Sequence, residues 1–359
     1  MKGRKQTIFF KNRPYIIGTY SIGGVKEGEG PMHEWFDQCL EDDTYGEKTW
    51  EKAESKMLKT AIVKAMERSG KSSDDIGAML SGDLLNQLMS SSFMARDMHI
   101  PFLGMYGACS TMTESMILGS VLVDGGYSDN VIAGASSHYC TAERQFRMPL
   151  EHGNQRPPSA QWTATAAGAV LIASADSDGR MSSDENGRVS RIRRIRVESG
   201  TIGKVIDAGV KDANQMGSAM APAAVDTLLN HLQDTGRTLD HYDAVFTGDL
   251  GFIGKSIVED LLVDAGFDKA VIDAVYDDCG AMIYEKEQDV HSGGSGCGCS
   301  ASLFAGYVCG KLRKGDFRKV LIMSTGALLS TISPFQGESI PGIWSSMRFR
   351  TEVREPASI

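Results

Sequence analysis

The stretch that decides the fold is "GACSTMTESMILGSVLVDGGYSDNVIAGASS", residues 107–137. It opens with small residues around Cys109, continues as an apolar helix pattern, turns at two glycines and ends in an apolar strand. A second stretch, "GCGCSASLFAGYVCGKLRKGDFRKVLIMSTG", residues 296–326, shows the same order of features 189 residues later. The repeat predicts a chain built from two similar halves.

Shorter matches extend the repeat. The stretches "AMLSGDLL" (78–85) and "AVFTGDLG" (244–251) each read as an apolar strand that ends in Gly-Asp-Leu. A helical pattern precedes each strand, and Gly70 and Gly236 stand where these helices should end. Helices that alternate with strands in this way favour an α/β fold with mostly parallel sheets covered by helices.

A repeat of about 170 residues is too long for a solenoid unit. We therefore expect two half-domains, residues 1–195 and 196–359, related by a pseudo-twofold axis and packed as one compact unit. Applying the offset of 189 residues places Cys109 opposite Gly298. Two helix N-termini facing each other between the halves would form a pocket suited to an anion.

The composition excludes several classes of protein. A net charge of −9 argues against a nucleic-acid-binding surface. One basic cluster, "RVSRIRRIR" (188–196), reads as a solvated strand, with docking on an anionic membrane or a protein partner as the alternative. No apolar run is long enough to span a membrane, and Lys11, Arg13 and Pro14 break the N-terminal apolar stretch. Seven cysteines without a signal peptide indicate free thiols in a reducing compartment.

Cys109 is the candidate for chemistry. A thiol at a helix N-terminus feels the positive end of the helix dipole, which favours the thiolate. Ser110, Thr111 and Thr113 are expected to bond the first free amides of that helix. The alternative is that Cys109 is only a small buried side chain.

These features together resemble the thiolase-like superfamily, which includes thiolases and type III ketoacyl synthases. The features are the doubled α/β chain, the cysteine that opens a central helix, the strand 165–174 and "GCGCSAS" before a helix. The stretches 204–228 and 289–308 are similar, more narrowly, to the stage V sporulation protein AD family. The resemblance covers nearly the whole chain, and it implies a thiolase-like α/β fold of duplicated βαβ halves with layered helices and mixed sheets.

The resemblance implies a function in spore formation. It implies a protein that binds dipicolinic acid, with or without calcium, and takes part in its uptake into the developing spore. It further implies a chain without a transmembrane segment, cytoplasmic at first and then peripheral at the spore inner membrane, where it meets membrane proteins of the same uptake system. It suggests a homodimer, because thiolase-like proteins pair through their central sheets, and no resident cofactor or metal.

The chemistry of the superfamily needs a thiolate, a histidine and a second histidine or asparagine. Where the resemblance places the first histidine, this chain has Gly248 or Asp249, and where it places the second partner it has Cys297-Gly298-Cys299. We therefore expect a degenerate catalytic site used for ligand binding. The alternative is an acyltransferase of the ketoacyl-synthase type with Cys109 as nucleophile.

Six residues are the candidates for ligand binding: Cys109, His138, Thr165, Asp249, His291 and Gly298. His291 is the one plausible substitute for a catalytic histidine. His138 and Thr165 have structural alternatives, as a satisfied histidine and a hydroxyl bonded to the local backbone. Asp249 recurs as Asp83 in the first half, and the symmetry favours a role in capping a helix or pinning a turn. A metal site is not expected, because Cys297 and Cys299 supply only two of about four ligands.

Overall fold

A computed structural model describes residues 5–146, 155–175, 177, 193–330 and 332–353. Its centre is a twelve-stranded sheet whose main path runs β11-β10-β13-β14-β9-β2-β8-β6-β4-β5. The first-half strands are β2 (Tyr15–Gly23), β4 (Ala78–Gly82), β5 (Phe102–Gly104), β6 (Asn130–Ser137) and β8 (Ala166–Ala173). The second-half strands are β9 (Arg193–Ile202), β10 (Ala244–Thr247), β11 (Tyr276–Asp278), β13 (Lys319–Ala327) and β14 (Gly342–Val353).

Short strands complete the sheets. β1 (Thr7–Phe9) pairs with β9, and β3 (Gln38–Cys39) pairs with β2. A separate two-stranded sheet joins β7 (Trp162–Thr163) of the first half to β12 (Gly294–Ser295) of the second. This small sheet is one of the places where the halves are tied together.

The strand order confirms the duplication. From its outer edge each half follows the same path, β5-β4-β6-β8-β2 in the first and β11-β10-β13-β14-β9 in the second. The outer three strands of each half pair parallel to one another. The fourth strand, β8 or β14, pairs antiparallel with both of its neighbours. The sheet is therefore mixed, which confirms the mixed sheets that the resemblance implies. The mostly parallel pairing expected from the alternation of helices and strands holds only for the outer strands, because β8 and β14 return antiparallel to β6 and β13.

The halves meet where β2 pairs antiparallel with β9, with Tyr15 opposite Arg196 and Ile16 opposite Ile195. The expected division at residue 195 falls inside β9. By its place in the strand order, β9 is the second-half counterpart of β2, so the strand as a whole groups with the second half.

The helices fall into corresponding sets. The first half contains α1 (Val25–Gly28), α2 (Trp50–Ser69), α3 (Met89–Arg96), α4 (Thr111–Asp124) and α5 (Tyr139–Phe146). The second contains α6 (Met216–Thr235), α7 (Gly251–Asp264), α8 (Lys269–Val275), α9 (Cys279–Met282), α10 (Cys297–Leu303), a π-helical turn (Phe304–Val308) and α11 (Cys309–Lys314). Short 3-10 turns are η1 (His33–Trp35), η2 (Ser73–Asp75), η3 (Asn86–Leu88), η5 (Ala213–Gln215), η6 (Leu239–His241), η7 (Lys286–Gln288) and η9 (Ser333–Gln336).

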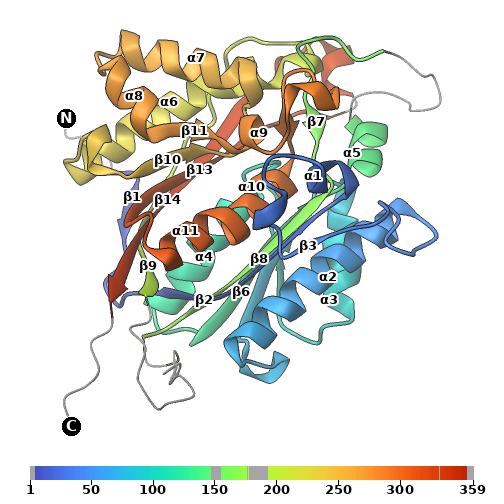
Figure 1. The fold of residues 1–359 in the computed structure, drawn as a ribbon, viewed down its shortest axis with the longest axis vertical. Coiled ribbons are helices and arrows are strands. Elements are labelled where there is room, and N and C mark those ends of the chain that lie inside the picture. The colour runs from blue at the N-terminus through green and yellow to red at the C-terminus, as the bar shows by residue number, and fades with distance from the viewer. Residues whose placement is uncertain (1–4, 147–154, 176, 178–192, 331, 354–359) are drawn as a thin grey trace.

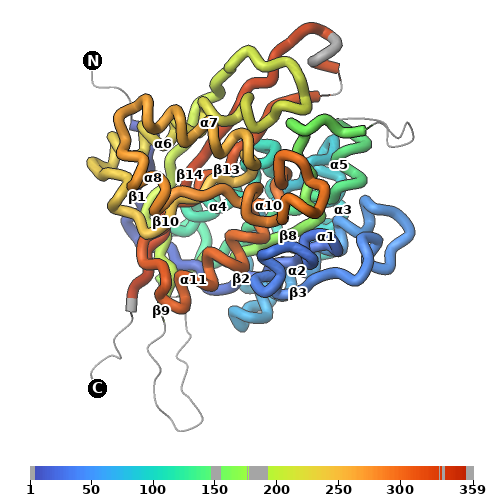
Figure 2. The backbone as a smooth tube through the Cα atoms, turned by 45° about the horizontal axis from the view of Figure 1, so that its top comes forward, coloured from blue at the N-terminus to red at the C-terminus, as the bar shows by residue number. Residues whose placement is uncertain are grey.

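The helices and strands form layers (Figures 1 and 2). α2 covers the outer face of the first-half strands, and α6 covers β13 and β14 of the second half. α4 and α10 lie in the middle, where α4 contacts strands of both halves and packs against α10. Three buried apolar clusters correspond to these interfaces, with the largest around the central helices.

The expected ends of the outer helices are confirmed. α2 ends at Gly70 with φ of 69°, and α6 ends at Gly236 with φ of 63°. Both glycines adopt the left-handed conformation that closes a helix, which a side chain would strain. Among the described residues, no helix is both long and apolar enough to cross a membrane.

Candidate functional site

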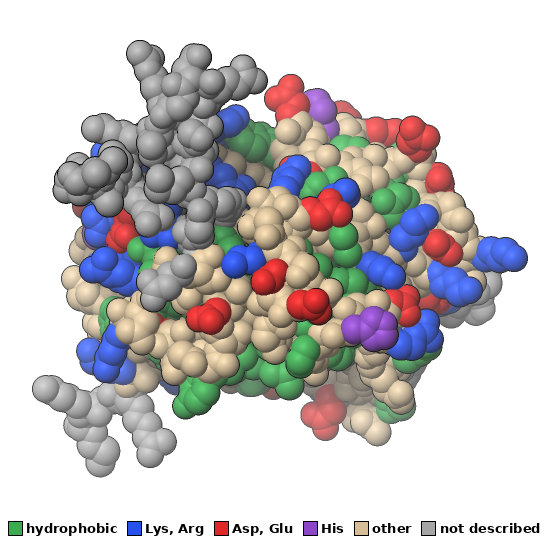
Figure 3. Space-filling model, turned by 90° about the horizontal axis from the view of Figure 1, so that it is seen from below, with side chains coloured by type: hydrophobic (Ala, Val, Ile, Leu, Met, Phe, Trp, Pro, Cys, Tyr) green, Lys and Arg blue, Asp and Glu red, His purple; other side chains and the backbone are tan. Residues whose placement is uncertain are grey.

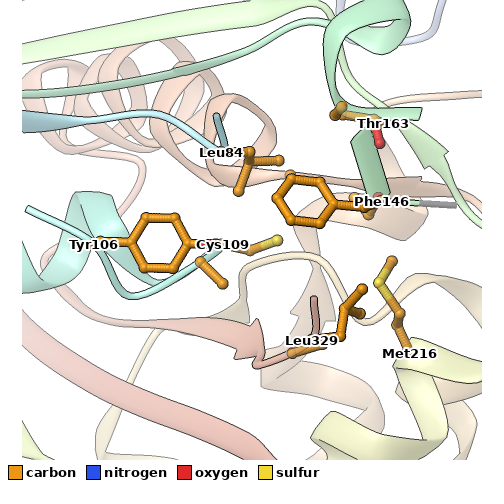
Figure 4. Close-up of a pocket in the computed structure, with 12 residues that line it drawn as sticks. Leu84, Tyr106, Cys109, Phe146, Thr163, Met216 and Leu329 are labelled. Carbon is orange, nitrogen blue, oxygen red and sulfur yellow. The ribbon is translucent and has the colours of Figure 1, made fainter. Parts of the chain in front are cut away.

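A small pocket lies between the two halves at the start of α4 (Figure 4). Its volume is about 40 Å³, well below the roughly 300–1,000 Å³ of a typical ligand pocket. It is lined by Leu84, Tyr106, Ala108, Cys109, Ala142, Phe146, Thr163, Met216, Ser295, Gly296, Ala327 and Leu329. Both halves contribute, and most of the wall is apolar.

The turn before α4 holds Cys109 in place. Ala108 adopts a φ of 50°, a left-handed conformation that costs a non-glycine residue about 1–3 kcal/mol. A Cβ at Gly107 would meet the carboxylate of Glu114, and this flexible side chain would then have to move to admit any larger residue. The chain therefore makes a tight turn, and the sulfur of Cys109 points into the space bordered by Phe146 (Figure 4).

The expected helix cap is wrong. No side chain caps α4, and the hydroxyls bond backwards into the turn instead. The Ser110 hydroxyl lies 2.7 Å from the Gly107 carbonyl, and the Thr111 hydroxyl donates to the Ala108 carbonyl at 2.7 Å. Thr113 bonds Ser324 of β13 across the interface. These bonds fix the strained turn rather than the helix end.

The pKa of the Cys109 thiol is raised well above its usual value. Burial is the largest cause, and the carboxylate of Asp249 and the thiol of Cys297 add to it, while the amide of Gly296 acts in the opposite direction. A helix dipole is worth at most about 2 kcal/mol, whereas full burial can shift a pKa by 3–5 units. Cys109 is therefore a neutral thiol at pH 7, and the expected thiolate is not supported.

Asp249 lies behind Cys109 and not in the pocket wall. The chain places it just after β10, fully buried. It accepts hydrogen bonds from the amide of Gly296 at 2.8 Å and from the hydroxyl of Thr325. The sequence had marked this position as the one where a catalytic histidine is missing, and the structure puts a carboxylate against the thiol there.

The second-half partner of Cys109 is Gly296 rather than Gly298. Gly296 lines the pocket and has a φ of 100°. Gly298 is packed away from the pocket, because its amide donates to the Ser137 hydroxyl at 3.1 Å and a Cβ would overlap the Ala166 carbonyl. The offset of the repeat thus predicted the correct turn and missed the lining residue by two positions.

His291 is also outside the pocket wall. It has a φ of 55°, and its Nε2 lies 3.3 Å from a carboxylate oxygen of Asp289. In this structure it does not stand in for a catalytic histidine beside Cys109.

His138 and Thr165 belong to a neighbouring buried cluster. The His138 Nε2 donates to the carbonyl of Asp43 at 2.8 Å, and its Nδ1 accepts from the amide of Cys140 at 3.2 Å. Burial lowers the pKa of His138, so the ring is neutral. The hydroxyl of Thr165 accepts from the amide of Tyr139 at 3.1 Å. Both side chains bond backbone groups, His138 reaching Asp43 and Thr165 reaching Tyr139, and neither lines the pocket.

The same cluster contains a buried acid, Glu27. It accepts hydrogen bonds from the Tyr284 hydroxyl and from the Thr165 amide at 3.0 Å. Burial raises the pKa of Glu27 to about 7. Since Tyr284 follows α9, this bond ties the first half to the second.

Sequence reasoning missed the apolar walls. Tyr106, Phe146, Met216 and Leu329 come from four segments distant in sequence, and Figure 4 shows them around Cys109. Tyr106 stands three residues before Cys109, but it was not among the residues selected from the sequence. The others carry no motif and are brought to the site only by the fold.

The second-half cysteines bond carbonyl groups. The Cys297 thiol donates to the carbonyl of Ser136 at 2.9 Å, and the Cys299 thiol donates to the carbonyl of Gly248 at 3.7 Å. Within the ranges described, no group of three or more His, Cys, Asp or Glu is placed to hold a metal ion.

Comparison with solved structures shows the class of fold. Human mitochondrial 3-ketoacyl-CoA thiolase is 12% identical, with a TM-score of 0.57, and covers 96% of this chain and 99% of its own. Cerulenin-bound OleA from Xanthomonas campestris is 14% identical, with a TM-score of 0.59, covering 97% and 99%. 3-Oxoacyl-[acyl-carrier-protein] synthase III from Aquifex aeolicus is 12% identical, with a TM-score of 0.51, covering 94% and 99%. The chain is therefore a thiolase-like α/β protein.

Within that class the sequence is more specific. The model of the stage V sporulation protein AD family matches residues 4–349. Stage V sporulation protein AD of Bacillus subtilis (strain 168) is 41% identical over 339 residues, which is 94% of this chain and 95% of the relative. The chain belongs to the stage V sporulation protein AD family, and so is a sporulation protein.

Proposed function

We propose that this protein binds dipicolinic acid in the pocket at Cys109 and takes part in its uptake into the developing spore. The family membership supports the sporulation role. The observation that carries the binding role is the state of Cys109, a neutral thiol backed by the carboxylate of Asp249. A neutral thiol with a carboxylate where the superfamily has a histidine favours occupancy of the pocket over catalysis.

The walls of the pocket suit one part of the ligand. Dipicolinic acid has a flat aromatic ring, and Tyr106, Phe146 and Leu329 offer apolar surface to such a ring. The ligand is larger than the cavity of about 40 Å³, so binding requires side chains at the rim to move. Tyr106 is 48% exposed and has solvent to turn into.

The charge of the pocket favours the calcium complex of the ligand. None of its lining residues is a lysine or an arginine, and Asp249 lies just behind the wall. A free dianion would therefore meet a like charge at short range. A one-to-one complex with Ca²⁺ has no net charge and avoids that repulsion, with the calcium as part of the cargo.

Calorimetric titration with dipicolinate, with and without calcium, tests the proposal. We expect saturable binding that is tighter with calcium. Cys109→Trp, which fills the pocket, should abolish the heat while leaving the circular dichroism spectrum unchanged. No heat and no thermal shift at millimolar ligand in either form would refute the assignment.

An acyltransferase with Cys109 as nucleophile is the second candidate. The strained turn at Ala108 and the Gly296 amide beside the thiol favour it, because they hold the thiol in a fixed position near a hydrogen-bond donor. Incubation with an acyl-thioester, followed by intact-mass measurement, separates the two functions. Acylation of Cys109 that turns over would establish the enzyme.

We also propose that two copies pair through the edge of the first half. The sheet ends at β5, and the exposed apolar side chains of Met89, Phe93 and Leu103 lie on β5 and next to it. An open strand edge with apolar neighbours is a surface that proteins usually cover. Light scattering should give the mass of a dimer for the parent and of a monomer for Leu103→Lys.

The location proposed is peripheral, cytoplasmic at first and then at the spore inner membrane, through membrane proteins of the same uptake system. Fractionation of sporulating cells tests it. The protein should sediment with membranes, and deletion of the membrane components of the system should release part of it.

A further inference from the structure

Four segments at one end of the central strands together hold 11 of the 37 lysines and arginines of the chain. They are residues 11–15, 193–197, 311–319 and 350–353, called here the basic end face. Their cations are Lys11, Arg13, Arg193, Arg194, Arg196, Lys311, Arg313, Lys314, Arg318, Lys319 and Arg350. Their acids are Asp316 and Glu352, so the formal charge of the face is +9 on a chain of −9.

The fold brings these segments together. Arg350 lies opposite Arg196 of β9 and opposite Lys319 of β13, and Tyr15 lies opposite Arg196. The guanidinium of Arg193 packs against Gly315 at the end of α11. Figure 3 views the molecule from this end and shows Lys and Arg side chains over much of the visible surface, with acidic side chains among them. The face is therefore continuous although its segments are far apart in sequence.

Neighbouring acids neutralise only part of the charge. Asp124 accepts from Asn12, Asp243 accepts from the amides of Arg318 and Lys319, and Glu198 lies near Arg350. Counting these three carboxylates leaves a formal charge of +6.

Several of the cations have no acidic partner. Among the described residues, the side chains of Arg313, Lys314 and Arg318 form no ion pair. Arg313 donates to the Thr19 hydroxyl at 2.8 Å, and Lys314 lies 4.6 Å from the centre of the Trp35 ring. All three residues are exposed, so solvent and a charged surface can reach them.

We propose that the basic end face binds the surface of an anionic lipid membrane directly. The charge is spread over several elements, and three cavities of the described residues, at Cys109, beside α2 and α3, and beside η2, are all lined by other segments. A broad charged face without a groove fits a lipid surface better than an acidic peptide, which needs a groove to fix its backbone. Two exposed aromatic side chains flank the face, Phe9 two residues before Lys11 and Tyr127 three residues after Asp124, and such rings favour the membrane interface.

This inference goes beyond recruitment by membrane proteins, because the contact is with lipid and does not depend on dipicolinate. Each basic residue near an anionic surface strengthens binding about fivefold, and the attraction fades within a Debye length. Binding should therefore be strong at low ionic strength and largely lost in about 0.5 M salt.

Sedimentation of the full chain with vesicles tests the proposal. The vesicles are pure phosphatidylcholine, or phosphatidylcholine with about a third phosphatidylglycerol. We expect binding to the anionic vesicles and none to the neutral ones. Reversing four exposed charges of the face together, Arg313→Glu, Lys314→Glu, Arg318→Glu and Arg350→Glu, should weaken binding at least 100-fold.

The matched control reverses four exposed lysines of other elements, Lys48→Glu, Lys52→Glu, Lys211→Glu and Lys286→Glu. It has the same net charge as the first variant and should keep binding within about fivefold of the parent. Equal losses in both variants would mean that net charge acts and not this face. No binding of the parent to anionic vesicles, or binding to polyglutamate in place of lipid, would overturn the proposal.

Discussion

The two Gly-Asp-Leu strand ends have the same sequence and do different work. In the first half Asp83 stays local, accepting from the amides of Leu85 at 2.8 Å and Ser91 at 2.7 Å. In the second half Asp249 crosses the interface between elements, bonding Gly296 and Thr325 and facing the thiol of Cys109. The first copy of the motif therefore stabilises the local fold, whereas the second copy contributes its aspartate to the surroundings of the pocket.

Another carboxylate, that of Asp278, takes the local role in the second half that Asp83 has in the first. Asp278, at the end of β11, accepts from the amides of Leu250 and Gly251 at 2.9 Å each and from Ala281 at 2.9 Å. It pins the turn after β10, the role that Asp83 fills after β4. The symmetric role expected for the two aspartates therefore holds for Asp83 alone.

The largest effect on stability should come from Asp278. Asp278→Ala leaves three amides without their acceptor, and each buried unpaired donor costs about 1–3 kcal/mol. We expect the free energy of unfolding, measured in urea, to fall by about 4 kcal/mol. Asp277→Ala is the control, since Asp277 is partly exposed and pairs with Lys255, and it should cost less than about 1 kcal/mol. Equal losses for the two variants would contradict the pinning role.

Much of this fold was predictable from sequence, and the reason is local. Gly70 and Gly236 mark helix ends through their own backbone preference, and the repeat of Gly-Asp-Leu marks matched strands. The antiparallel return of β8 and β14 has no such local signal. It depends on which strand edges are free once the parallel strands have paired.

The site was less predictable than the fold. Cys109 was found because a helix start is visible in sequence, but its charge state depends on burial and on Asp249, which no spacing reveals. Gly298 was chosen by counting along the repeat, whereas Gly296 lines the pocket because α10 begins with a different turn from α4. Apolar walls such as Phe146 and Met216 carry no motif and are known only once the chain is folded.

The second-largest effect on stability should come from Glu27, which is another acid that bonds across the two halves. Its pKa is about 7 when folded and near 4.5 when unfolded, so the folded state binds more protons between these values. The contribution of Glu27 to the free energy of unfolding is therefore greatest below about pH 4.5. It falls by roughly 2–3 kcal/mol as the pH rises to 7. Glu27→Gln keeps the shape and should flatten the dependence in that window.

Urea unfolding at half-unit pH steps measures this slope. Glu54 and Asp83, both buried with raised pKa values, add slope of the same sign in parent and variant alike. The difference between the two curves therefore isolates Glu27. Parallel curves from pH 4.5 to 7 would show that Glu27 does not titrate there.

Asp249→Asn should change the reactivity of Cys109 by about tenfold. The amide removes a negative charge beside the thiol, so the pKa of Cys109 falls and more thiolate is present at pH 8. The folded protein is alkylated and digested, and mass spectrometry of the peptide that contains Cys109 gives the rate of alkylation of this thiol relative to the other cysteines. Asp83→Asn is the matched control and should leave the rate within twofold. If both variants accelerated the alkylation of Cys109 equally, the cause would be loosened packing and not the lost charge of Asp249.

The smallest effect predicted is that of Cys109→Ser on ligand binding. Serine keeps the size and the donor of the thiol but removes most of its nucleophilic power. If the site has been turned from chemistry to binding, affinity for dipicolinate should stay within tenfold of the parent, which is about 1.4 kcal/mol. Spores that carry the variant should then accumulate dipicolinic acid, scored by its content per spore, whereas Cys109→Trp spores should not. A well-folded Cys109→Ser protein that still binds the ligand yet yields spores without it would show that the thiol performs chemistry. In that case the carboxylate behind it modulates a nucleophile, and the second half of the duplication serves catalysis.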